Sequence, residues 1–248
     1  MSEVTEHAFA SKSVFGTQLR IEGSMQSICV TDDYIFVFGN DEHGTYADTG
    51  IVALFDRKYN YLGQARIIEF EHANSCCVVD SYIFCASRSG SIAYVPMSNI
   101  VTACNNNDTV SGVNTISISS IQTSSGIAYD SVRKEMLIID STDGENLYYN
   151  IFSYNSTSKT LTLKKHFDIN IIDSIDEFIE SPIITHRGRL RGAPGNITYK
   201  NGVIYMVYWY HGGGDAEDTW FSAAHTVGYL LEIDACTGLP VTNIGLFR

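Results

Sequence analysis

Carboxylate side chains are concentrated in three polar segments between apolar runs: residues 39–49 (GNDEHGTYADT), 140–146 (DSTDGEN) and 211–220 (HGGGDAEDTW). Oxygen-rich loops can hold Ca²⁺, and two carboxylates at a suitable separation can serve as the acid and base of a glycosidase. Segment 140–146 lacks the spacing of an EF-hand loop, which weakens the case for Ca²⁺. Ca²⁺ stays a candidate, and no other cofactor is indicated. No pair of acids stands out as catalytic, and these residues can equally serve only to solvate a surface.

Aromatic and histidine side chains lie in or beside the same segments. Aromatic rings can stack on the C–H faces of a sugar while neighbouring polar groups bind its hydroxyls. The alternative for Trp209 is that it ends a strand and packs inside the fold. We predict a carbohydrate-binding site made by Asp41, His43, Tyr46, Trp209, Tyr210, His211, Asp215 and Trp220.

Four repeated segments must position these loops. Each has four short runs rich in Val, Ile, Tyr, Phe and Thr, separated by turn residues such as Asn201-Gly202. Four antiparallel strands in about fifty residues are typical of a β-propeller blade. We therefore predict an all-β fold, a β-propeller of four-stranded antiparallel blades that forms a single domain over residues 1–248. The predicted blades are residues 24–70, 72–119, 124–167 and 194–247.

Two segments lie outside this plan. Residues 15–22 resemble the outermost strand of a blade, because Gln18-Leu-Arg-Ile-Glu can be aligned with Gln64-Ala-Arg-Ile-Ile-Glu. This N-terminal strand either closes a four-bladed ring or belongs to a partial fifth blade, so we predict four to five blades. Residues 168–192 form an insertion in which apolar residues recur at helical spacing between positions 171 and 179, which predicts one short helix.

The propeller topology divides the loops between two faces. Strands a to d of each blade run from the centre outwards and alternate in direction. The b–c and d–a connections therefore share one surface, the loop face, and the a–b and c–d connections share the other, the turn face. The acidic segments and the 168–192 insertion fall on the loop face, whereas the turn face has tight turns and one polar excursion at residues 97–112. Because long loops on a rigid scaffold commonly bind ligands, we place function on the loop face.

Composition and charge exclude several classes of protein. Sixteen basic and 28 acidic residues give a net charge of −12, which argues against binding to nucleic acid or to an anionic membrane surface. Residues 186–191 (HRGRLR) are the only basic cluster along the chain, and they can pair with the acidic loops or hold an acidic ligand. No apolar run is long enough for membrane insertion, and the first twenty residues lack the apolar centre of a secretory signal. The six cysteines lack zinc-binding spacing and are expected to be reduced core thiols.

Small polar residues open the first strand of each unit, as in His72-Ala-Asn-Ser, Gln122-Thr-Ser-Ser-Gly-Ile-Ala-Tyr and Gly195-Asn-Ile-Thr-Tyr, and a Tyr-Ile-Phe or Val-Ile-Tyr strand follows. Such residues suit the walls of a narrow, hydrated channel. These units resemble the propeller platforms of receptor-binding tail proteins of phages that infect Gram-positive bacteria. The resemblance covers about residues 15–248 and implies recognition of a cell-surface glycan without chemistry, often as a homotrimer. It implies a protein that is virion-associated or made in the cytoplasm, and it transfers no site residue.

We therefore expect a non-enzymatic binding module for carbohydrate. Two alternatives stay open. One is a glycoside hydrolase or lyase that uses the loop carboxylates, and the other is a scaffold whose loops dock a protein partner.

Overall fold

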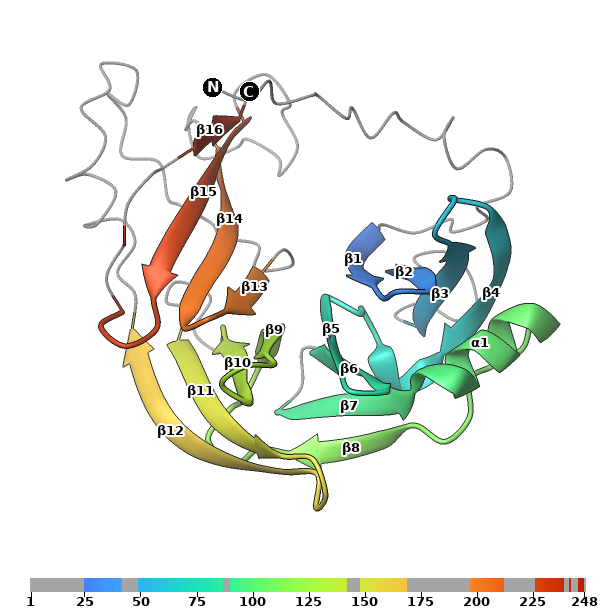
Figure 1. The fold of residues 1–248 in the computed structure, drawn as a ribbon, viewed down its shortest axis with the longest axis horizontal. Coiled ribbons are helices and arrows are strands. Elements are labelled where there is room, and N and C mark those ends of the chain that lie inside the picture. The colour runs from blue at the N-terminus through green and yellow to red at the C-terminus, as the bar shows by residue number, and fades with distance from the viewer. Residues whose placement is uncertain are drawn as a thin grey trace.

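The computed structural model describes residues 25–41, 49–86, 90–141, 148–168, 197–211, 226–238, 241 and 245–247. These residues form four antiparallel sheets of four strands, and each sheet contains consecutive strands in the order a to d. The sheets stand around a common centre as the blades of a β-propeller (Figure 1). The predicted all-β propeller is therefore confirmed, and the described residues form four blades.

Every blade is a simple meander, which is the topology that short turns between antiparallel strands dictate. Blade 1 contains β1 (Met25–Val30), β2 (Tyr34–Asp41), β3 (Thr49–Asp56) and β4 (Tyr61–Ile67). Blade 2 contains β5 (Ser75–Val79), β6 (Tyr82–Ala86), β7 (Ser91–Pro96) and β8 (Asn114–Ser117). Blade 3 contains β9 (Ser124–Asp130), β10 (Glu135–Asp140), β11 (Tyr148–Asn155) and β12 (Thr160–Asp168). Blade 4 contains β13 (Ile197–Lys200), β14 (Val203–His211), β15 (Thr226–Asp234) and β16 (Gly245–Phe247).

Apolar faces of neighbouring blades make the core. The innermost strands β1, β5, β9 and β13 lie side by side in that order (Figure 1). Between blades 1 and 2, Phe36, Phe38 and Leu54 are fully buried in one apolar cluster. Between blades 2 and 3, Phe84 meets Tyr154 edge-on, with ring centroids 5.5 Å apart. Side chains alternate between the two faces of a strand. Blade 2 therefore buries both faces of its sheet, one against blade 1 and the other against blade 3.

A helix, α1 (Met97–Asn106), occupies the β7–β8 connection, where the sequence indicated only a polar excursion. Ile100, Ala103 and Cys104 recur at helical spacing and are buried against blade 1, so the helix is amphipathic despite its polar residues. Asn107 adopts a left-handed conformation with φ 52°, which ends the helix. Within the described ranges no helix is long and apolar enough to span a membrane. The helix predicted in residues 168–192 and the strand predicted at 15–22 lie outside the described residues.

Two serines of the innermost strands join neighbouring blades. The Ser27 hydroxyl of blade 1 accepts a hydrogen bond from the Cys76 amide of blade 2, at 2.9 Å. The Ser75 hydroxyl of blade 2 accepts from the Ile127 amide of blade 3 at 3.1 Å and donates to the Ile127 carbonyl at 3.2 Å. Both serines are buried, so these two polar residues of the innermost strands serve as hydrogen-bonded joints between blades.

Replacing Ser75 with Ala is expected to lower the free energy of unfolding by about 1–3 kcal/mol, because the buried Ile127 amide loses its acceptor. Urea unfolding followed by far-UV circular dichroism measures the change. Ser153→Ala is the control, because its hydroxyl bonds to Thr162 near the surface, and it should cost less than about 0.5 kcal/mol. Equal losses for the two variants would refute the role of Ser75 as a joint.

The cysteines are free thiols, as expected, and Cys29, Cys76, Cys85 and Cys104 are buried. Burial raises the pKa of Cys104 to about 12 and raises the pKa values of Cys29 and Cys76 well above their ordinary value. These thiols therefore act as small apolar core residues rather than as nucleophiles.

Candidate functional site

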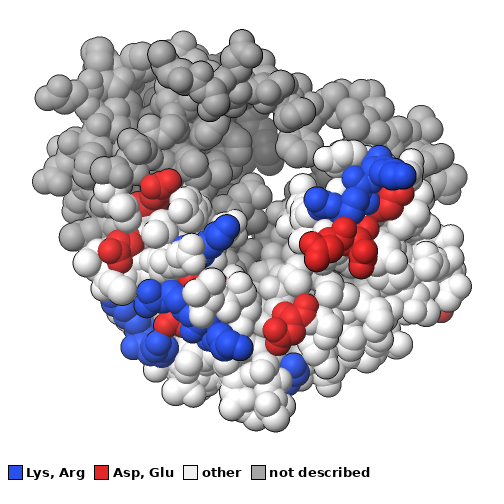
Figure 2. Space-filling model, in the orientation of Figure 1, with Lys and Arg blue, Asp and Glu red and all other residues white. Residues whose placement is uncertain are grey.

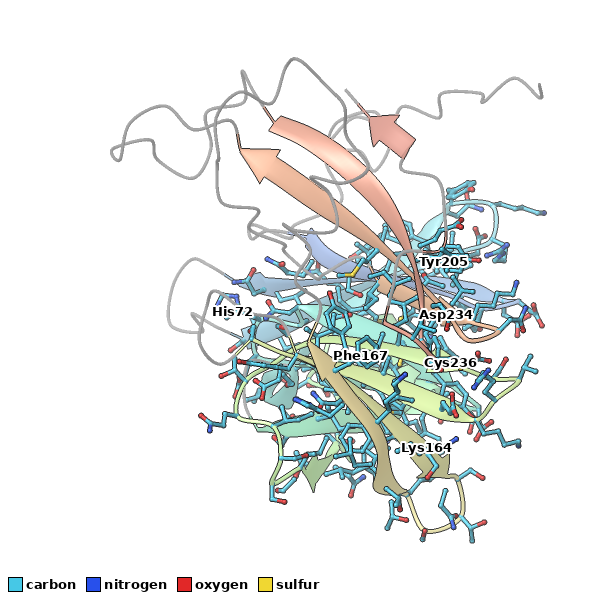
Figure 3. All side chains as sticks on the ribbon, turned by 90° about the vertical axis from the view of Figure 1, so that its left-hand side faces the viewer. His72, Lys164, Phe167, Tyr205, Asp234 and Cys236 are labelled. Atoms are coloured by element: carbon cyan, nitrogen blue, oxygen red, sulfur yellow. The ribbon has the colours of Figure 1, made fainter. Side chains whose placement is uncertain are left out.

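The two faces of the propeller are distinct in the side view. Figure 3 places His72 near one edge of the blades and Lys164, Asp234 and Cys236 near the opposite edge. His72 lies in the d–a connection between blades 1 and 2, on the loop face, and Asp234 and Cys236 lie at the c–d turn of blade 4, on the turn face. The candidate ligand site and the charged joints described below therefore lie on opposite sides of the molecule.

Four of the predicted site residues lie at strand ends that reach the loop face. Asp41 is the last residue of β2, and Trp209, Tyr210 and His211 are the last three residues of β14. His211 pairs with Thr226, the first residue of β15, so the β14–β15 ladder continues to its end. The structure thus brings Trp209, Tyr210 and His211 to one corner of blade 4 and sets Asp41 on blade 1. His43, Tyr46, Asp215 and Trp220 lie outside the described residues, and the site as a whole stays a prediction.

A hydrogen bond between side chains fixes the end of β2 at the loop face. The Asn40 side-chain amide donates to Nδ1 of His72 at 3.1 Å, so the end of β2 is tied to the connection that leads into blade 2. Asn40 itself is 1% exposed. Since this bond joins β2 to the d–a connection, it anchors the end of the strand that precedes residues 42–48.

Asp140 is a second anchor of the loop face. Its carboxylate is buried and accepts backbone hydrogen bonds from Gln122 at 3.2 Å and Thr123 at 3.1 Å, both in the connection between blades 2 and 3. The sequence placed Asp140 among the acids available to a ligand, whereas its carboxylate in fact holds the chain. A carboxylate is well suited to this task, because it can accept several N–H donors at once.

A pair of rings that the sequence did not single out lies on the outer strands of blade 3. The His166 and Tyr148 rings stack with centroids 5.6 Å apart and planes 17° apart. His166 Nδ1 donates to the side-chain oxygen of the buried Asn150 at 2.8 Å, which fixes the orientation of the imidazole. The register of β11 against β12 brings these residues together, and that register cannot be read from spacing alone.

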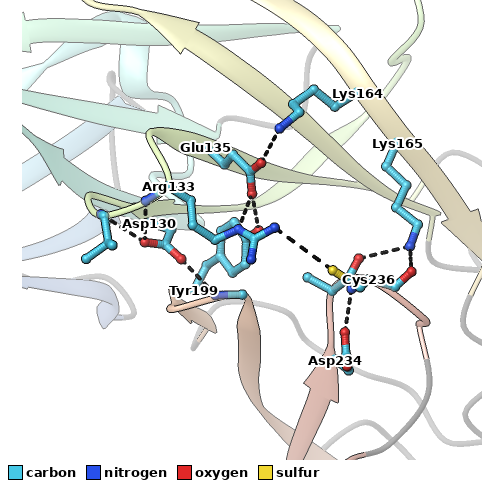
Figure 4. Close-up of polar contacts among 11 residues, drawn as sticks. Asp130, Arg133, Glu135, Lys164, Lys165, Tyr199, Asp234 and Cys236 are labelled. Carbon is cyan, nitrogen blue, oxygen red and sulfur yellow. Dashed lines mark hydrogen bonds and ion pairs between the residues drawn. The ribbon is translucent and has the colours of Figure 1, made fainter.

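On the turn face, charged side chains join blade 3 to blade 4 (Figure 4). Glu135, which is 4% exposed, accepts hydrogen bonds from Arg133 Nε at 2.9 Å, Lys164 Nζ at 2.5 Å and the Tyr199 hydroxyl at 2.6 Å. Nearby Asp130 accepts the Gly202 amide of blade 4 at 2.9 Å, and Lys165 donates to the carbonyls of Ala235 and Cys236. Each of these hydrogen bonds joins a charged group of blade 3 to another group of blade 3 or to blade 4. The bonds that cross between the two blades make the network a structural joint.

The electrostatics of Glu135 do not suit a general acid. Desolvation pushes its pKa up, but the hydrogen bonds from Lys164, Tyr199 and Arg133 together outweigh desolvation and lower the pKa below its ordinary value. A glycosidase acid needs a raised pKa. In turn, desolvation and the bond to Glu135 raise the pKa of Tyr199, so this hydroxyl stays protonated and acts as a donor.

Basic residues gather on the turn face of blade 3. Figure 2 shows basic side chains grouped on the lower left of this face, with acidic groups among and beside them. The a–b turn of blade 3 carries Arg133 and Lys134 and its c–d turn carries Lys159, whose Nζ lies 4.1 Å from the centre of the Tyr82 ring of blade 2. The sequence indicated only residues 186–191 as a basic cluster, and the fold creates this second one from separate turns. Among the described side chains, no group of three or more His, Cys, Asp or Glu is placed to hold a metal ion.

Comparison with known proteins adds no family. No protein-family model and no curated protein matches the chain. Hydrazine synthase of Kuenenia stuttgartiensis aligns at 12% identity and TM-score 0.45, over 94% of this chain and 52% of that one. A chain of the nidogen/laminin complex aligns at 11% identity and TM-score 0.44, over 91% and 80% respectively. A chain of the mitotic checkpoint complex aligns at 14% identity and TM-score 0.38, over 70% and 43%.

This chain therefore spans about half of the hydrazine synthase chain and less than half of the checkpoint chain. Identities and TM-scores this low assign no activity. What the structure itself shows is a propeller scaffold whose blades are tied by hydrogen bonds and whose described connections are anchored.

Proposed function

We propose that this chain is a non-enzymatic binding module that recognises a carbohydrate through its loop face. The observation that carries the proposal is the placement of Trp209, Tyr210 and His211 at the loop-face end of β14. The connection that follows them contains Asp215 and Trp220. Aromatic rings beside carboxylates fit a sugar, because the rings cover its C–H groups and the oxygens bind its hydroxyls.

The scaffold favours recognition over catalysis. The buried carboxylates Asp130, Glu135 and Asp140 are each held by two or more hydrogen-bond donors, so they maintain the fold instead of facing a substrate. Resemblance to phage tail platforms makes a cell-surface glycan the most fitting ligand, bound by a virion-associated trimer. A Ca²⁺ ion held by loop acids is compatible with this proposal, since such an ion can bridge carboxylates and sugar hydroxyls.

A glycan array combined with product analysis tests the proposal. Binding to a defined glycan without release of shorter oligosaccharides is the expected result. Release of cleaved sugar would overturn the proposal in favour of a glycoside hydrolase or lyase. Retention of a protein partner with no glycan bound would favour an interaction scaffold.

Replacing Trp220 with Ala is expected to weaken binding to the glycan identified on the array by about tenfold, because one stacking contact of about 1.4 kcal/mol is lost. The melting temperature should change by no more than about 3 °C, since the residue is predicted to face the ligand. Isothermal titration and thermal unfolding measure the two effects. Tyr59→Ala, which removes an aromatic ring that is 66% exposed on the turn face, is the matched control and should leave affinity unchanged. A large fall in melting temperature for Trp220→Ala would show that it is a packing residue.

A further inference from the structure

An open groove runs along the turn face between blades 1 and 2. It has a volume of about 670 Å³ and is walled by the β1–β2 turn, the end of β5 and the first turns of α1. Its floor is apolar and includes Tyr34, Val78, Met97 and Val101, which cover the core cluster between the two blades. Val30, at the edge of the floor, is 54% exposed. The groove therefore offers apolar surface that the described residues leave in contact with water.

The rim of the groove is acidic. Asp32 and Asp33 form the tip of the β1–β2 turn, and Asp80 lies in the β5–β6 turn. Among the described residues that line the groove, no Lys or Arg is present. An apolar floor with three carboxylates at its edge repels anions and favours a ligand that is both cationic and aliphatic.

Hydrogen bonds hold the walls in place. The Thr31 amide donates to the Tyr34 carbonyl at 2.9 Å, and the Thr31 hydroxyl accepts the Tyr34 amide at 3.0 Å, which sets the shape of the acidic turn. The Met97 amide donates to the Ser81 carbonyl at 2.9 Å, so the start of α1 is tied to the turn that carries Asp80. A groove with fixed walls binds at a lower entropic cost than one that must form on binding.

We propose that this groove binds a short extended segment of a partner protein in which Lys or Arg alternates with aliphatic residues. The aliphatic residues would lie on the apolar floor, and the long basic side chains would run their methylene stems over Val30 at its edge while their charged ends reach the aspartates. The groove lies on the opposite side of the blades from the loops, so this interaction is independent of carbohydrate binding.

Fluorescence anisotropy with a labelled hexapeptide of alternating Lys and Leu tests the proposal on the full chain. This peptide is expected to bind at least about tenfold more tightly than an alternating Glu–Leu peptide and more tightly than an alternating Lys–Ser peptide. Raising the salt concentration from about 50 mM to about 500 mM should weaken binding of the Lys–Leu peptide, because salt screens the attraction between its lysines and the aspartates. Equal binding of the Lys–Leu and Glu–Leu peptides would overturn the proposal.

Substitutions then locate the site. Replacing Asp32, Asp33 and Asp80 together with Asn should weaken binding of the Lys–Leu peptide by about tenfold. Asn retains the shape and tolerates the left-handed backbone of Asp80, which has φ 54°, so the fold is expected to persist. Val101→Thr, which keeps the branched shape but makes the floor of the groove more polar, should weaken binding of the Lys–Leu peptide by about threefold.

The matched control removes the same charge elsewhere, by Glu69→Gln, Asp108→Asn and Glu232→Gln together. It should leave peptide binding unchanged. An equal loss in the control and in the groove variant would show that the net charge alone attracts the peptide, and would overturn the proposal. Trp220→Ala should not affect the peptide, and the triple Asn variant should not affect the glycan, so failure of either interaction can be told from failure of the other.

Discussion

Replacing Glu135 with Ala is expected to lower the free energy of unfolding by about 3 kcal/mol. The carboxylate is buried, and its removal leaves the Tyr199 hydroxyl, on a residue that is 2% exposed, without its acceptor. Arg133 and Lys164 are partly exposed, with 39% and 49% of their side chains accessible, so water can hydrate their charges once Glu135 is removed. Loss of these two ion pairs therefore adds little to the fall in unfolding free energy. Urea unfolding gives the change in free energy, and a loss below about 1 kcal/mol would contradict the prediction.

A double-mutant cycle separates the contact between blades 3 and 4 from the rest of the network. Glu135→Gln and Tyr199→Phe are each conservative in shape, and their coupling energy is expected to be about 1–2 kcal/mol because they share one hydrogen bond. Glu232→Gln paired with Tyr199→Phe is the control, and it should give additive losses. A coupling near zero for the first pair would mean that the bond does not tie the blades.

The pH dependence of stability gives an independent check on the same group. The folded pKa of Glu135 lies below the ordinary 4.5 of glutamate. Its contribution is therefore fully present above pH 4.5 and is lost as the pH falls through the folded pKa. As the pH falls below 4.5, the free energy of unfolding should fall more steeply for the wild-type protein than for Glu135→Gln. At neutral pH the plots of unfolding free energy against pH should run parallel for the two proteins.

The blades could be predicted because their signal is local and repeated. Each strand carries its own alternation of apolar residues, and each turn carries its own turn residues, so four meanders follow from short windows of sequence. Helix α1 escaped prediction because only three of its residues, Ile100, Ala103 and Cys104, are buried, and its polar C-terminal asparagines resemble a loop. The joints were missed for another reason. Glu135 and Tyr199 are 64 positions apart, and only the closure of blade 4 onto blade 3 brings them together.

The candidate site shows the same division. The sequence could assign residues to the loop face, because loop placement follows from strand order, and β2 and β14 end there with Asp41 and with Trp209 to His211. It could not distinguish an acid that holds the chain from one that faces a ligand. Asp140 is of the first kind because the backbone amides of Gln122 and Thr123 donate to it, a contact set by the register of β10 against β9, where Asp140 pairs with Ser124.

Replacing Gly63 with Ala is expected to lower the free energy of unfolding by about 3 kcal/mol or to prevent folding. A Cβ at position 63 would lie 2.1 Å from the Cys104 carbonyl oxygen and 2.7 Å from the carbonyl carbon, both backbone atoms of α1. The clash cannot be relieved by turning a side chain, so either β4 or α1 must move. Soluble yield and urea unfolding measure the effect.

Gly112→Ala is the matched control, because it lies in the same β7–β8 connection and meets only the flexible end of Asn99, at 2.9 Å. Its backbone has φ 75°, so it should cost about 1–2 kcal/mol from the left-handed conformation alone. Since α1 walls the groove, a Gly63→Ala protein that still folds should also bind the Lys–Leu peptide more weakly, whereas Gly112→Ala should bind it normally. If both glycine variants lose the same stability, close contact between β4 and α1 is not what holds the helix, and the buried side chains of Ile100 and Cys104 must hold it instead.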